Sequence, residues 1–292
     1  MRAFSCRLLK KKATFTDYEA CAESLIASGW TVPGAIAVHG ASAGGLLCGV
    51  ALNSRPDIWA CVVSDVGFVD VVQSVADPTI PLAVTEWEEW ASARCDHNAP
   101  RALRIAAPGA ARRTRAHPTL FPHSLFLLQG NPNEREAFEY IKTYSPLDNV
   151  RPPPSRAAQA ARHADALRGR LPLRAGGAAT TPRVLRAGYA HPHPPTLLTA
   201  GLNDSRVAFW EAAKFAARLR DAAEQALARD AVAASAALTP AALAAIRARA
   251  GANIALKTDM GAGHFSLSDR YLYLREKAFV YAFVCDSLGV EA

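Results

Sequence analysis

The most constraining feature of the sequence is the stretch 39–47, which reads His-Gly-Ala-Ser-Ala-Gly-Gly-Leu-Leu. An apolar, strand-like run (35–38) precedes it, and a run of small residues typical of a helix (45–53) follows from its end. Strand, Gly-x-Ser-x-Gly and helix in this order form the context of a nucleophile elbow, a tight turn that exposes the serine hydroxyl above the sheet edge. We expect Cβ atoms at positions 40 and 44 to clash with the neighbouring strand or helix. Taken alone, the pattern fits an ordinary Gly/Ala-rich loop equally well.

Downstream of this stretch, strand-like runs alternate with helical segments. Strands are predicted at 60–64, 195–201 and 253–257, and helices at 13–28, 136–143, 207–220 and 271–287, with a further alanine-rich helical stretch at 221–250 that Pro240 breaks. Thr16 is a candidate N-cap of the first helix, with Glu19 as its capping-box partner. The alternation predicts an α/β fold with a doubly wound, mostly parallel sheet.

Three residues suited to acyl transfer each follow a predicted strand: Ser42, Asp204 and His264. Their order along the chain is that of the α/β-hydrolases. Ser42 would attack a carbonyl, His264 would take and return its proton, and Asp204 would orient the imidazole. The backbone N–H of Ala43 would be one oxyanion donor. Each residue alone could be an ordinary turn or loop residue, but together their order and positions favour a catalytic triad.

Composition limits the other classes of function. The net charge of +7 is confined to two segments: 91–129 carries +5 and 151–187 carries +7, so the rest of the chain has a net charge of −5. This distribution argues against nucleic acid as a partner. No apolar run is long enough to span a membrane. The six cysteines are scattered without a CxxC pair or a histidine cluster, so we expect no metal, no cofactor and a reducing, cytoplasmic location. The basic N-terminus loosely resembles an organelle transit peptide, but we prefer to interpret it as a surface flank of the first helix with a lysine cluster.

The same two segments, 91–129 and 151–187, interrupt the alternation of strands and helices. Both are rich in Arg, Ala and Pro and contain no Lys, the composition expected of a translated GC-rich intron. Long structureless insertions are unusual inside a compact domain. We therefore predict a single catalytic domain over 1–292 in which these two segments are disordered or artefactual insertions.

Many short motifs, in one order, resemble the prolyl oligopeptidase family and most of all its oligopeptidase B branch. They lie at 8–18, 40–47, 68–72, 85–90, 130–132, 144–150, 201–207 and 261–266. The resemblance implies the α/β-hydrolase domain of a cytoplasmic serine endopeptidase that cuts short peptides. In that family an N-terminal β-propeller normally screens substrates by size.

The resemblance also implies roles for individual residues. The glutamate pair of the basic-specific branch corresponds to Glu86 and Glu88, which would bind an Arg or Lys at P1, as two carboxylates suit a guanidinium fork. Arg206 corresponds to the arginine that contacts substrate carbonyls. The propeller and a tyrosine that donates the second oxyanion hydrogen bond fall outside the 292 residues. Two alternatives therefore stay open: a catalytically impaired fragment of such a peptidase, and an esterase or acylaminoacyl-peptidase-like hydrolase, against which the acidic pair argues.

Overall fold

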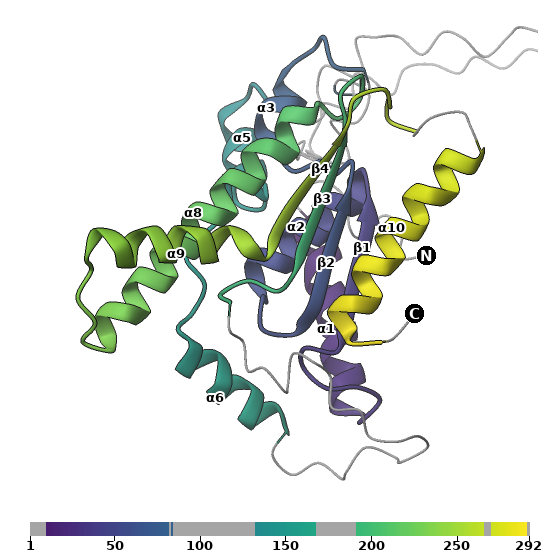
Figure 1. The fold of residues 1–292 in the computed structure, drawn as a ribbon. Helices are drawn as coiled ribbons and strands as arrows, with labels where there is room; N and C mark the ends of the chain where they lie inside the picture. Colours follow the sequence, from purple (N-terminus) through teal and green to yellow (C-terminus); the bar gives the residue numbers. More distant parts are fainter. Residues whose placement is uncertain (1–9, 82, 84–131, 168–190, 266–269, 291–292) are drawn as a thin grey trace, which may run out of the picture.

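The structure is a computed structural model that describes residues 10–81, 83, 132–167, 191–265 and 270–290 (Figure 1). Within these residues, four parallel strands form one sheet in the order β1 (Ile36–Ala41), β2 (Trp59–Asp65), β3 (Thr196–Gly201) and β4 (Ile254–Asp259). Parallel strands need crossover connections, and helices supply them here. The predicted α/β fold with a mostly parallel, doubly wound sheet is confirmed.

Helices cover both faces of the sheet (Figure 1). On one face, α10 (Arg270–Leu288) places Val280 against Val63 and Leu197. On the other face, α1 (Lys12–Ala27), α2 (Ala43–Ser54) and α8 (Phe209–Ala233) enclose the main core around Val62 and Leu198. Consecutive residues of β2 and β3 thus point to opposite faces and are buried on both, which explains why these strands read as continuous apolar runs.

Four further elements lie around this sheet. They are α3 (Val71–Ala76), α5 (Arg135–Lys142), the 3₁₀ turn η5 (Leu147–Asn149) and α9 (Pro240–Ala252). α3 and α5 pack together in a second apolar cluster, and α9 folds back on α8. Helices cover most of 221–250 as predicted, but the break lies at 234–239, before Pro240. Pro240 is the first residue of α9, and the Thr239 hydroxyl accepts a hydrogen bond from the Ala242 amide.

The predicted N-cap of the first helix is wrong. α1 begins at Lys12, and the Thr16 hydroxyl donates back to the carbonyl of Ala13 (3.2 Å) instead of capping the helix. The lysines and alanine before Thr16 are good helix formers. In addition, Phe15 packs on Tyr144 with ring centroids 5.5 Å apart, so the extra turn buries an aromatic ring.

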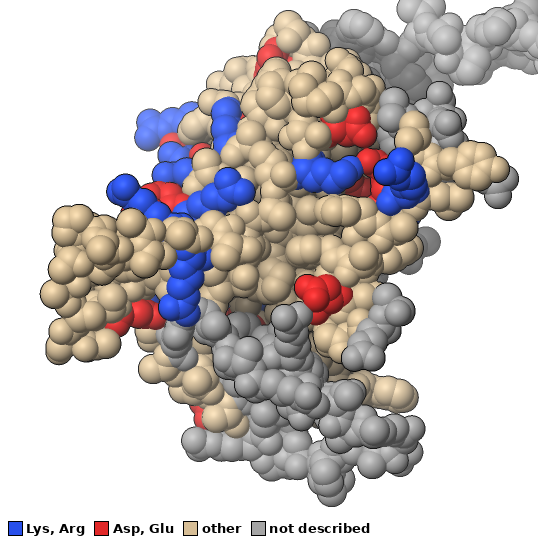
Figure 2. Space-filling model, viewed as in Figure 1, with Lys and Arg blue, Asp and Glu red and all other residues tan. Residues whose placement is uncertain are grey.

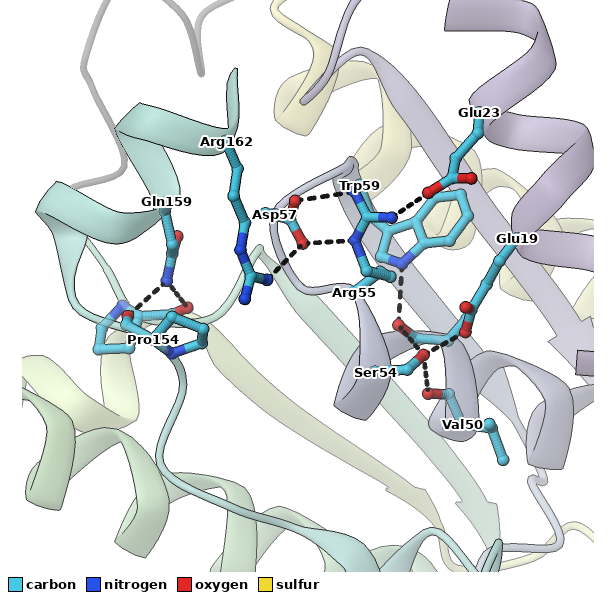
Figure 3. A network of polar contacts seen from close by, with 12 residues as sticks. Glu19, Glu23, Val50, Ser54, Arg55, Asp57, Trp59, Pro154, Gln159 and Arg162 are labelled. Carbon is cyan, nitrogen blue, oxygen red and sulfur yellow. Dashed lines mark hydrogen bonds and ion pairs between the residues drawn. The ribbon is translucent and has the colours of Figure 1, made fainter. Parts of the chain in front are cut away.

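Part of the second predicted insertion packs on the domain. Residues 156–167 form helix α6 (Arg156–Leu167), which the composition did not indicate. Gln159 is buried and donates to the carbonyls of Pro154 (3.0 Å) and Pro192 (3.4 Å), while Arg162 lies 4.0 Å from the buried carboxylate of Asp57 (Figure 3). The same carboxylate receives two hydrogen bonds of 3.0 Å from Arg55, which also pairs with Glu23 of α1. The network therefore links α6 to the start of β2 and to α1.

The surface in Figure 2 mixes charges of both signs. Lys and Arg side chains lie beside Asp and Glu over the upper half of this face, whereas the outer ends of α8 and α9 are almost uncharged (Figure 2). None of the helices in the described part of the chain is long and apolar enough to cross a membrane. The described residues also hold no group of three or more His, Cys, Asp or Glu side chains arranged for a metal ion.

Candidate active site

Ser42 lies at the turn between β1 and α2 with φ 54° and ψ −119°, a conformation that side-chain-bearing residues rarely adopt. Its backbone is held from several sides: the amide donates to Asp65 O (3.0 Å), and the carbonyl accepts from Gly45 N (2.9 Å) and Phe68 N (3.0 Å). Its side chain makes no capping hydrogen bond to α2. The surrounding backbone thus imposes a strained turn on a serine whose hydroxyl the helix does not use, as the elbow interpretation predicts.

The close contacts around this turn correct one prediction. A Cβ atom at Gly40 would lie 2.4 Å from Gly44 O, so the predicted clash there is confirmed. At Gly44, however, a Cβ atom would meet nothing within 4 Å, and the predicted clash is wrong. The second crowded position is Gly45, where a Cβ atom would lie 2.4 Å from the Cα of Gly67. The helix therefore approaches the loop after β2 through Gly45, a residue outside the five-residue pattern.

Asp204 and His264 meet in the structure. His264 Nδ1 lies 2.8 Å from Asp204 Oδ2, and because a carboxylate accepts, the proton of that hydrogen bond is on Nδ1. The Asp204 side chain is fully buried, and its other oxygen accepts from the backbone amides of Arg206 (2.8 Å) and Val207 (2.9 Å). The aspartate is therefore fixed by its own loop and fixes the imidazole in the tautomer that leaves Nε2 as the acceptor.

Two loops at the end of the sheet bring this pair together. Leu202 N donates to Asp259 O (2.8 Å), and Asn203 N donates to Ala262 O (3.0 Å), so the loops after β3 and β4 lie side by side. A Cβ atom at Gly201 would lie 2.7 Å from the carbonyl oxygens of Ala262 and Gly263, which restricts this position to glycine. Asp259 accepts from the amides of Gly261 (2.9 Å) and Ala262 (3.0 Å), and the first of these hydrogen bonds is the main cause that lowers its carboxyl pKa.

The remaining predicted residues have mixed outcomes. Ala43 is the first residue of α2, where helical amides have no intrahelical acceptor. The Arg206 guanidinium lies 4.6 Å from the centroid of the Phe265 ring, next to His264. Ser42 and His264 are both described and make no hydrogen bond with each other in the structure. Glu86 and Glu88 lie outside the described residues, as does the first predicted insertion, 91–129.

A cavity of about 140 Å³ adjoins Ser42. Its described wall is apolar apart from two serines and one arginine, and it is formed by Ser42, Ala43, Phe68, Ser74, Val75, Ile80, Pro81, Ala83, Arg206 and Val207. A second cavity of about 210 Å³ lies between the sheet and α10 and includes His264 but not Ser42. The smaller cavity is therefore the candidate pocket for a substrate side chain.

Sequence reasoning missed Glu211, which is completely buried behind this cavity. Its carboxylate accepts hydrogen bonds from the amides of Val69 (2.9 Å) and Asp70 (2.8 Å) and from the Ser74 hydroxyl (2.6 Å). Burial raises its pKa to about 7, although these hydrogen bonds act in the opposite direction. A signal was available: Glu211, Phe215 and Leu219 recur every four residues, so the glutamate occupies the apolar stripe of its helix.

Comparison with known proteins adds the family. A family model described as "Prolyl oligopeptidase family" matches residues 3–126 and 180–291. The chain belongs to the prolyl oligopeptidase family. Residues 127–179 lie between the two matched parts, so most of the first predicted insertion falls inside the match and most of the second falls outside it.

Relatives within this family match this chain over part of their own length. "Protease 2" of Moraxella lacunata is 30% identical over 98% of this chain and 27% of its own length, and "Dipeptidyl aminopeptidase BI" of Pseudoxanthomonas mexicana is 28% identical over 97% and 25%. Oligopeptidase B from Leishmania major (TM-score 0.60, 29% identity) and from Trypanosoma brucei with covalently bound antipain (TM-score 0.59, 32% identity) each align with 98% of this chain and 26% of their own. The chain spans about a quarter of these relatives and matches their catalytic region.

Proposed function

We propose that this chain is the catalytic domain of an oligopeptidase B-like serine endopeptidase that cleaves short peptides after Arg or Lys. The observation that carries the proposal is the buried Asp204 hydrogen-bonded to His264 at the sheet edge where Ser42 occupies its strained turn. Family membership gives the reaction class, serine peptidase hydrolysis. Neither a metal nor a cofactor has a part in the proposed reaction, and a cytoplasmic location is proposed with it.

The proposed steps give each of the three residues a role. Ser42 Oγ attacks the scissile carbonyl carbon while its proton passes to His264 Nε2, and the resulting imidazolium is stabilised by the buried Asp204 carboxylate. The oxyanion accepts from the Ala43 amide at the start of α2, where the helix dipole is positive. The imidazolium then protonates the leaving amine, and water, activated by the same histidine, hydrolyses the acyl-enzyme.

The specificity proposal depends on residues next to the cavity. The described wall contains no carboxylate, and it includes Ala83, three residues before Glu86. An apolar wall accommodates the methylene stem of an Arg or Lys side chain, and Glu86 and Glu88 would pair with its charged end. Without those carboxylates, the same pocket would suit a neutral substrate group, as in the esterase or acylaminoacyl-peptidase-like alternative.

A covalent fluorophosphonate probe tests the nucleophile on the 292-residue chain itself. We expect the probe to modify Ser42, the Ser42→Ala variant to lose all labelling, and Asp204→Asn to label about 10³–10⁴ times more slowly because the imidazole would lose its tautomer. Ser205→Ala, an exposed serine on the Asp204 loop, is the matched control and should label normally. Equal labelling of parent and Ser42→Ala would refute the triad, and an unlabelled parent would favour the impaired-fragment alternative.

A pair of fluorogenic peptides tests the specificity. The parent should hydrolyse a peptide with Arg at P1 faster than one with Leu at P1, and the double variant Glu86→Gln/Glu88→Gln should lose at least about 100-fold in kcat/KM on the basic peptide only, since two desolvated carboxylates would be missing. Parallel losses on both peptides would contradict the assignment of these glutamates to the P1 pocket.

A further inference from the structure

One wall of the cavity beside Ser42 is the segment 68–75, which follows β2. Phe68, Ser74 and Val75 line the cavity, and the Phe68 amide donates to the Ser42 carbonyl (3.0 Å). The segment leaves the sheet after β2, so no β-ladder fixes Val69 or Asp70 in place. A shift of residues 69–75 would therefore change the shape of the cavity.

Glu211 of α8 holds the rear of the segment. Its Oε2 accepts from both the Val69 and Asp70 amides, and its Oε1 accepts from the Ser74 hydroxyl. The side chain is fully buried and is not among the residues that line the cavity, so it touches the wall from behind and does not reach the space that a substrate would fill. The Glu211 carboxyl group thus binds both the loop before α3, at Val69 and Asp70, and α3 itself, at Ser74.

A second link between α8 and the same segment is weaker. Lys214 pairs with Asp70 (2.8 Å) and donates to Gln73 (2.7 Å), but its side chain is 42% exposed. Exposed ion pairs contribute little to holding a segment, whereas removing a buried acceptor leaves desolvated amides unpaired. Of the two links from α8 to residues 69–74, the buried one is therefore that of Glu211, while the Val69 carbonyl separately accepts from the Leu147 amide (3.0 Å).

We propose that Glu211 is a positioning residue for the substrate side-chain pocket: through Val69, Asp70 and Ser74 it sets the wall of the cavity beside Ser42. This inference rests on the proposed function, because the cavity is a substrate pocket only if Ser42 is the nucleophile. Glu211 acts on the binding of the P1 group and takes no part in the chemical step.

Hydrogen exchange tests the anchoring independently of any activity. Glu211→Gln keeps one oxygen for the two amides and an N–H₂ group for the Ser74 hydroxyl, so exchange at Val69 and Asp70 should stay as in the parent. Glu211→Leu removes both acceptor oxygens and with them all three hydrogen bonds, and Glu211→Asp, one methylene shorter, reaches the amides poorly. Both should exchange at least about tenfold faster at these two amides. Glu224 lies on the same helix as Glu211 and pairs with Arg247 of α9. Glu224→Leu, which breaks that pair, is the matched control and should not change exchange at these two amides.

Two phosphonate probes then separate binding from chemistry at Ser42. A small dialkyl fluorophosphonate leaves the pocket empty, and a peptidyl diphenyl phosphonate places an Arg side chain in it. In Glu211→Leu or Glu211→Asp, KI for the peptidyl probe should rise about tenfold, while kinact and the rate with the small probe stay within about twofold because the triad is untouched. Glu211→Gln should restore the parent KI.

The outcomes distinguish the two proposals. If neither probe labels the parent chain, the proposed function fails and the pocket role fails with it. If the parent is labelled but KI is unchanged in variants whose Val69 and Asp70 amides exchange faster, only the positioning role is refuted. Equal losses with both probes in Glu211→Leu and Glu211→Asp would also refute it, because they would show a general disturbance of the domain.

Discussion

Replacing Ser42 by glycine should stabilise the fold while removing the nucleophile. Ser42 has φ 54° and ψ −119°, where a Cβ atom crowds the backbone and glycine does not. Such a residue costs about 1–3 kcal/mol in strain. Glycine relieves this strain and loses about 0.5–1 kcal/mol through the greater entropy of the unfolded chain. Since the side chain makes no capping hydrogen bond to α2, little else is lost.

Alanine is the informative comparison, because Ser42→Ala removes the hydroxyl and keeps the Cβ atom. The free energy of unfolding of Ser42→Gly should exceed that of Ser42→Ala by about 1–2 kcal/mol, measured by urea denaturation followed by circular dichroism. Ser28 provides a matched control: it ends α1 at φ −81° and ψ −2°, a conformation in which alanine is relaxed. There the order should reverse, with Ser28→Gly less stable than Ser28→Ala by about 0.5–1 kcal/mol.

The reasoning is refuted if Ser42→Gly unfolds at lower urea than Ser42→Ala while the Ser28 pair behaves as stated. That result would mean that the turn holds Ser42 without strain, and the hydrogen bonds at its amide and carbonyl would then be ordinary turn contacts. The opposite result would show that stability is given up at the position where the nucleophile is presented.

Three further predictions concern the frame of the site and two buried groups. Gly45→Ala should destabilise the fold by about 2 kcal/mol or more, because its Cβ atom would lie 2.4 Å from the Gly67 backbone. Gly44→Ala, whose Cβ atom would have no neighbour within 4 Å, should be neutral or stabilising, and the thermal unfolding temperatures of the two variants test this difference. Burial and the neighbouring His191 lower the pKa of His193 from 6.5 to about 3. The free energy of unfolding should therefore decrease as the pH falls from 6.5 towards 3, by up to about 1.4 kcal/mol per pH unit, and the urea midpoint of His193→Phe should not show this decrease. Burial raises the pKa of Glu211 from 4.5 to about 7. Its contribution to the free energy of unfolding should therefore decrease as the pH rises from 4.5 to 7, and Glu211→Gln should not show this decrease in the same assay.

Much of the fold was predictable because local pattern and burial agree. The apolar runs at 60–64 and 195–201 are buried on both faces of the sheet, so their composition indicated strands directly. Asp204 and His264 each follow a predicted strand, and they meet in the structure because the carboxyl ends of parallel strands share one edge of the sheet. The start of α1 was not predictable in this way, because Phe15 gains its partner Tyr144 from a segment far along the chain.

The sequence predicted those residues of the site whose type alone suits them to the chemistry. It did not predict residues whose importance depends on contacts with distant parts of the chain. Gly44 belongs to the five-residue pattern, yet the crowded position is Gly45, because the constraint comes from Gly67 after the next strand. Glu211 was overlooked because a glutamate in a helix is ordinarily exposed, and only its place on the apolar stripe marked it. Helix α6 has the Arg/Ala-rich composition of its segment, and its position depends on two distant groups, the Asp57 carboxylate and the Pro192 carbonyl.

His193 and Glu211 change the free energy of unfolding in opposite directions as the pH rises, and this affects how the pH dependence of the parent chain is interpreted. Between about pH 4.5 and 6.5 the unfolded chain takes up a proton at His193, while the folded chain holds one at Glu211. The two contributions to the pH dependence of unfolding therefore oppose each other over this interval, and a flat curve for the parent would not mean that neither group titrates. Each single substitution removes one contribution and exposes the other, with slopes of opposite sign. The two variants together thus test both buried groups more stringently than the parent curve can.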